Sequence, residues 1–199
     1  MNCLFNNGCG RCFCRSKCCR REKCNCRPQC PPCEQNRCST EGNLIINGDF
    51  ESWFSQDSPT DWSHTGNGIT SGVFRNYLPE NVLSGAYSAG IKNATLSQVV
   101  PIKAGCFYRL SFSARTNSIT SLLIAAVIFI TAEGEEINAT EIFIAGESLP
   151  TIEGVFNYYS RVTERTPVDA VAARISFTAA TSSLSRYVFL DNVSFSGVS

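Results

Sequence analysis

The cysteines are the residues with the clearest capacity for chemistry, because eleven of the twelve lie between Cys3 and Cys38. Only Cys106 lies in the rest of the chain. Thiols at this density form disulfides or bind soft metal ions as thiolates. The clustered residues are Cys3, Cys9, Cys12, Cys14, Cys18, Cys19, Cys24, Cys26, Cys30, Cys33 and Cys38.

Two uses of these thiols compete. Cys9-x2-Cys12 and Cys30-x2-Cys33 have the spacing of a four-thiolate zinc site, which leaves the remaining thiols unexplained. Alternatively, the segment is a covalent arm that forms disulfides with neighbouring molecules. An odd number of cysteines favours a bond that leaves the arm, and basic neighbours lower thiol pKa values and so promote disulfide exchange. We favour intermolecular disulfides and keep zinc as the alternative.

Charge is divided in the same way as cysteine. Residues 1–38 carry eight Lys or Arg and two acids, whereas residues 39–199 carry nine Lys or Arg and fifteen acids. The basic segment offers only Phe5 and Phe13 for stacking on bases, so we expect no nucleic-acid partner. Its first residues lack the unbroken apolar stretch of a secretory signal, so we expect synthesis without a signal peptide. The longest apolar run, 122–130, is shorter than the roughly 20 residues of a membrane helix, so we expect no membrane partner.

From Gly42 onward, apolar residues alternate with polar ones, which is typical of strands with one face on a core. Turn residues separate these runs, and no helical periodicity accompanies them. The pattern predicts an all-β fold, a two-sheet antiparallel β-sandwich of the jelly-roll type at residues 43–199, preceded by an irregular Cys-rich arm at residues 1–42. The residues expected to face the core include Cys106, Tyr108, Leu110, Phe112, Val171, Ala173, Ile175, Phe177, Phe189, Val193 and Phe195.

Five segments of the β region occur in the order seen in jelly rolls of carbohydrate-binding modules. They are NLIINGDFESW at 43–53, PTDW at 59–62, LSGAYSAGI at 83–91, SQVVPIKAGCFYRLSFSAR at 97–115 and YVFLDNVSF at 187–195. The chain resembles these modules over nearly all of residues 43–195. It is most similar to the NTTRR-F1 domains of spore-forming Bacillus relatives, which implies a place on the spore surface, in the exosporium, the coat or an appendage.

The resemblance also implies candidate site residues. In many such jelly rolls, acids at the positions of Glu51 and Asp191 bind a structural calcium ion, and Asp49 is a possible further ligand. Ordinary hydrogen bonds at strand ends are the alternative role for these acids. Sugar sites need exposed aromatic rings, for which Trp53, Tyr158 and Tyr159 are the candidates. Trp62, by contrast, matches a position that commonly packs in the core.

The segment 122–130 is apolar on both faces of its expected strand, so the face that avoids the core must be covered. A loop or another subunit could cover it. We assign self-association to the face formed by Leu123, Ala125, Val127 and Phe129.

The sequence offers little for catalysis. His64 is the only histidine, and no motif of a nucleophile elbow or metalloprotease accompanies it. We therefore expect no enzymatic activity. The leading hypothesis is a self-assembling spore-surface protein, made in the mother-cell cytoplasm and joined by disulfides to itself and to other surface proteins. The alternatives are a sugar-binding module anchored by the arm, with a glycan as its partner, and a zinc protein.

Overall fold

The computed structural model describes Cys38, residues 42–66, 70–182 and 185–198. Those residues form twelve strands and two short 3₁₀ turns, Pro79–Asn81 and Gly146–Ser148. None of the helical segments among them has the length and apolar character needed to cross a membrane. The strands are β1 (Trp53–Ser55), β2 (Ser58–Pro59), β3 (Ser63–His64), β4 (Gly72–Asn76), β5 (Ser88–Lys92), β6 (Ala94–Pro101), β7 (Phe107–Thr116), β8 (Leu122–Thr131), β9 (Glu136–Ala145), β10 (Asn157–Val162), β11 (Ala170–Ala180) and β12 (Val188–Val198).

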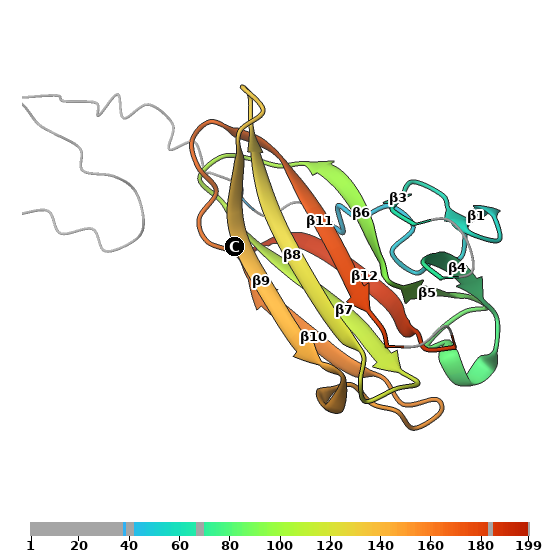
Figure 1. The fold of residues 1–199 in the computed structure, drawn as a ribbon. Coiled ribbons are helices and arrows are strands. Elements are labelled where there is room, and N and C mark those ends of the chain that lie inside the picture. The colour runs from blue at the N-terminus through green and yellow to red at the C-terminus, as the bar shows by residue number, and fades with distance from the viewer. Residues whose placement is uncertain (1–37, 39–41, 67–69, 183–184, 199) are drawn as a thin grey trace, which may run out of the picture. The chain divides into compact units, whose positions relative to one another are not determined.

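Two five-stranded antiparallel sheets form a sandwich (Figure 1). The β7 sheet has the order β10-β7-β12-β5-β4, and the β8 sheet has the order β3-β6-β11-β8-β9. Consecutive strands alternate between sheets at several points, as in a jelly roll. The predicted fold class, an all-β antiparallel sandwich, is confirmed.

The core lies between the sheets, and its residues follow the expected alternation. Tyr108, Leu110 and Phe112 of β7 are fully buried and face Ile175 and Phe177 of β11. The ring of Phe112 meets that of Phe177 edge to face, with centroids 5.0 Å apart. Such pairs add about 1 kcal/mol to the free energy gained by burial. The predicted core rows are therefore confirmed for Tyr108, Leu110 and Phe112 of β7 and for Ala173, Ile175 and Phe177 of β11. The prediction was wrong for Val171, which is 50% exposed because the strand register is irregular between Ala170 and Ala172.

Trp62 is also a core residue, as the sequence predicts. It is 6% exposed, and its ring lies 5.3 Å from the ring of Phe50 and 6.2 Å from that of Phe177. Its indole Nε1 donates a hydrogen bond to the Asn47 carbonyl at 3.0 Å. The buried N–H is therefore satisfied, which a core tryptophan requires.

Two predicted strand faces need correction. In β8, the residues assigned to self-association point into the core and are 0–1% exposed. The outward row is the other one, and it is partly exposed. In β12, Phe189 lies on the outer face, because an irregularity between Asp191 and Ser194 reverses the alternation before Val193 and Phe195. The inward residues of β8 are Leu123, Ala125, Val127 and Phe129. The outward residues are Leu122, Ile124, Ala126, Ile128 and Ile130.

Cys38 forms a disulfide with Cys106 of the same chain, with their Cα atoms 5.3 Å apart. We assigned Cys38 to cross-links with other molecules, so that assignment is corrected. Cys106 is 3% exposed, as its place in the core row predicts, but its sulfur is bonded rather than free. The other ten arm cysteines, Cys3 to Cys33, lie outside the described residues, and so do the cross-linking and zinc predictions that rest on them.

Candidate functional site

The outer face of the β7 sheet presents a row of hydroxyl side chains on three adjacent strands. Strand pairing places Ser111 of β7 beside Ser160 of β10 and Ser194 of β12, and it places Arg109 beside Ser196. Direct partners in an antiparallel sheet project to the same side. We call this surface the serine platform; its residues are Arg109, Ser111, Ser113, Tyr158, Ser160, Ser194 and Ser196.

Tyr158 is the exposed aromatic residue of the platform. It pairs with Ser113 across the β10–β7 ladder, and 67% of its surface is exposed. Hydrogen bonds with Ser111 and then Ser160 lower the pKa of Tyr158, and the charge of Arg109 acts in the same direction. Because two thirds of its surface is exposed, the ring of Tyr158 is open to solvent on this face. A ring in this position can stack against the CH face of a sugar.

The end of the platform at Arg109 is hollowed. A cavity of about 340 Å³ is lined by Arg109, Ser196, Gly197 and Val198. No acidic side chain of the described part of the chain forms an ion pair with Arg109, whose guanidinium is exposed. The hollow thus combines a cation with hydroxyl groups in a volume suited to one or two sugar rings.

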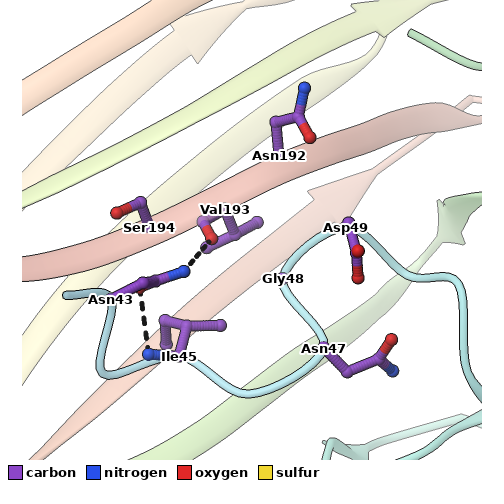
Figure 2. Close-up of a pocket in the computed structure, with 8 residues that line it drawn as sticks. All are labelled: Asn43, Ile45, Asn47, Gly48, Asp49, Asn192, Val193 and Ser194. Atoms are coloured by element: carbon purple, nitrogen blue, oxygen red, sulfur yellow. Dashed lines mark hydrogen bonds between the residues drawn. The ribbon is translucent and has the colours of Figure 1, made fainter. Parts of the chain in front are cut away.

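A second hollow, of about 420 Å³, lies on the other side of β12 (Figure 2). Asn43 fixes its wall: its Nδ2 donates to the Val193 carbonyl at 3.0 Å, and its Oδ1 accepts from the amide of Phe195 at 2.8 Å. Figure 2 shows Asp49 on the loop at one side and Asn192 on β12 at the other. Asp49 has no hydrogen bond or ion pair among the described residues, so its carboxylate can accept hydrogen bonds from a ligand.

The predicted calcium ligands Glu51 and Asp191 both hold the loop at 83–87. Glu51 Oε1 accepts hydrogen bonds from the amides of Ala86 and Tyr87 at 2.9 and 3.0 Å. Asp191 Oδ2 accepts from the amides of Leu83 and Ser84 at 2.9 and 3.2 Å, and its Oδ1 accepts from Asn192. The two carboxylates therefore act as anchors for one loop.

A calcium ion needs six to eight oxygen ligands around it, and the surroundings of Glu51 and Asp191 can be compared with that requirement. N–H groups, rather than carbonyl oxygens, point at Glu51 and Asp191, and no group of three or more His, Cys, Asp or Glu within the described residues could hold a metal ion. The donor set here fits hydrogen bonding better than cation binding. Calcium at Glu51, Asp191 and Asp49 stays a prediction.

Asp191 is completely buried, and its pKa is raised to about 6. Burial is the largest cause, opposed by the backbone N–H groups, while the charge of Glu51 raises the pKa further.

The other two predicted aromatic residues do not lie on the platform. Tyr159 points inward, its ring stacked on Phe112 at 5.4 Å and its hydroxyl donating to the Ser148 carbonyl at 3.0 Å. Trp53 is half-buried against the core, and its Nε1 donates to the Phe50 carbonyl. Only Tyr158 of the three offers an open ring on this face.

The same face continues into an aromatic cluster that sequence analysis missed. The ring of Phe74 on β4 lies 4.5 Å from that of Tyr187 and 6.4 Å from that of Phe189 on β12. Lys92 Nζ lies 5.0 Å from the Tyr187 ring centroid. Gly90 lies beneath the Phe74 ring, where a Cβ atom would collide with it. The signal that could have found the cluster is the pairing of Phe74 and Phe189 with Gly90, which requires the strand register.

Arg115 closes this cluster from above. It is 1% exposed, and burial lowers its pKa. Its guanidinium lies 5.6 Å from the Phe189 ring centroid, Nη1 donates to the Glu80 carbonyl at 2.7 Å and to Asn81 Oδ1, and Nη2 donates to the Thr151 carbonyl at 3.1 Å. Arg115 thus joins two loops over the cluster. The open part of the face is the part of the serine platform formed by Arg109, Tyr158 and Ser160, because Ser111 and Ser113 are buried.

No family model and no curated protein sequence matches this chain. Solved structures do. The chain is similar to the enzymatically active domain of tailspike protein 4 of bacteriophage CBA120, with 22% identity over 78% of this chain and a TM-score of 0.56. It spans only about a fifth of that protein, 21% of its length.

Two carbohydrate-binding modules are matched over almost their whole lengths. TmCBM61, solved in complex with β-1,4-galactotriose, is 18% identical, with coverage of 77% of this chain and 97% of that one and a TM-score of 0.52. The CBM22-1 xylan-binding domain of Paenibacillus barcinonensis Xyn10C is 12% identical, with coverage of 78% and 94% and a TM-score of 0.50. At these identities the likeness concerns the fold alone, and it shows that residues of the described β region adopt the jelly-roll fold of carbohydrate-binding modules.

Proposed function

We propose that this protein binds a glycan on the serine platform and that it does so without catalysis. The observation that carries the proposal is the exposed ring of Tyr158, which stands on the outer face between the serines of β7 and β10 in the strand register. A pyranose can stack its CH face on the ring while its hydroxyls exchange hydrogen bonds with Ser160 and Ser194, which are the more open serines of the platform. Solved modules of the same fold support this class of function, since one is in complex with β-1,4-galactotriose and another is a xylan-binding domain.

This proposal reverses the order of the hypotheses based on sequence, which gave assembly first place. A glycan array probed with the full chain tests it. Tyr158→Ala should abolish binding to the glycans that the unaltered chain selects, with an unchanged thermal unfolding midpoint, because Tyr158 is exposed. Tyr77→Ala is the matched control, since Tyr77 is 65% exposed but follows β4 at the opposite edge of the sheet. Binding that survives Tyr158→Ala would contradict the proposal.

A second role is proposed for the arm, which in this account attaches the module to a scaffold. Ten cysteines remain for it once Cys38 is bonded to Cys106. We propose that these thiols form disulfides with other copies and with other proteins of a spore surface, as the resemblance to NTTRR-F1 domains suggests. Electrophoresis of thiol-blocked native material, with and without reductant, tests this. A monomer in both lanes would contradict it and, with stoichiometric metal, would favour zinc.

A further inference from the structure

The serine platform carries one cation, Arg109, although the domain as a whole is acidic. Two acids lie beside the platform: Asp191, the buried ladder partner of Ser113, and Asp49, which lines the second hollow together with Ser194. Residues 39–199 hold fifteen Asp or Glu and nine Lys or Arg, yet no carboxylate in the described part of the chain lies within ion-pair distance of Arg109. By contrast, Arg174 on the outer face of the other sheet forms an ion pair with Glu136, so its charge is already neutralised. The charge of Arg109 is thus available to a ligand.

The position of Arg109 relates this charge to the stacking ring. Arg109 lies two residues from Ser111 on the same face of β7, and Ser111 pairs with Ser160, which lies two residues from Tyr158 on β10. Arg109 also lines the hollow of about 340 Å³ with Ser196, its partner across the β7–β12 ladder. A ligand stacked on Tyr158 would therefore extend over the hollow and bring its substituents to the guanidinium.

Guanidinium groups recognise carboxylates through two parallel N–H···O bonds, which are stronger than hydrogen bonds between neutral groups. A sugar that carries its carboxylate outside the ring could place its CH face on Tyr158 and its charge at Arg109. Asp49 lines the other hollow together with Ser194, so the carboxylate of such a ligand belongs at the Arg109 end of the platform.

We propose that the ligand of the serine platform is an acidic glycan built from uronic acid residues, with a carboxylate bound by Arg109. The inference rests on the proposed glycan-binding function and names the class of glycan. It also assigns Arg109 as the residue that determines specificity, while Tyr158 supplies affinity common to acidic and neutral sugars.

The test uses polygalacturonate and the same polymer after chemical reduction of its carboxyl groups, so that the two probes differ only in charge. Affinity electrophoresis of the full chain should show about tenfold tighter retention by the acidic polymer, the ratio expected for one charge-assisted pair. Arg109→Ala should remove this preference, so that the acidic and the reduced polymer are retained equally. Arg109 is exposed, so the variant should keep its thermal unfolding midpoint.

The basic arm attracts any polyanion, so the comparison must be made between variants that all retain it. Arg174→Ala is the matched control, because it removes one positive charge from the opposite face; it should keep the preference. Equal losses in the two arginine variants would overturn the assignment of Arg109. Equal binding of both polymers, lost in Tyr158→Ala, would overturn the acidic class while the proposed function stands. Binding to the acidic polymer that Tyr158→Ala leaves intact would overturn both.

Discussion

The disulfide between Cys38 and Cys106 gives a quantitative prediction. It joins residues 68 positions apart and encloses β1 to β6. In the chain-entropy description, a closed loop of this size lowers the entropy of the unfolded chain enough to stabilise the folded state by about 4 kcal/mol. Cys38→Ala should therefore lower the free energy of unfolding by about 4 kcal/mol. Cys106→Ala should lower it further, because Cys106 is also buried in the core.

Urea unfolding of the two single variants and the double variant measures this effect. The double variant should be no less stable than Cys106→Ala, since either change already removes the bond. Additive losses would contradict the reasoning. A direct check is peptide mapping with free thiols blocked, which should find the peptide of Cys38 linked to that of Cys106. If Cys38 were found linked to another molecule instead, the intrachain bond and its stabilisation would both be refuted.

Three further changes test the parts that hold the site. Asp191→Asn should remove a pH dependence of stability. In the unaltered protein, the folded state holds the proton of the Asp191 carboxyl more tightly than the unfolded state, so the free energy of unfolding should fall by about 3 kcal/mol as pH rises from 3.8 to 6. In the variant, the free energy of unfolding should change less over this pH range. Gly85→Ala, at φ +74° and facing Glu51, should cost at least about 1 kcal/mol in urea unfolding, and a neutral result would dispute the loop geometry. Phe129→Ala should cost about 3–5 kcal/mol and Ile128→Ala much less, since only Phe129 faces the core; the reverse ranking would refute the corrected β8 orientation.

Much of the fold follows from local pattern. The alternation in β7 places Leu110 and Phe112 in the core and Arg109 and Ser111 on the outer face, where Ser111 is covered by its neighbours and only 9% exposed. The same rule fails in β8, because both of its faces are apolar and alternation alone cannot say which one packs. It also fails for Phe189, because no residue pattern marked the irregularity after Asp191.

The site depends on contacts between distant segments, which explains what the sequence did not reveal. Tyr158 and Tyr159 are adjacent and chemically alike, and only the pairing of β10 with β7 decides which ring is open. The serines of the platform are unremarkable in sequence, because they come from three strands that meet only in the sheet. The bond from Cys38 to Cys106 likewise joins a dense run of thiols to one residue far along the chain.

The most direct test of glycan binding on the serine platform is to follow backbone amide resonances during titration with the glycan that the array selects. The account predicts that the resonances that shift belong to Ser111, Ser160 and Ser194, on three strands of the β7 sheet. Shifts confined to the outer face of the β8 sheet, around Ile128 and Thr178, would contradict the account and place the binding surface on the opposite side of the sandwich.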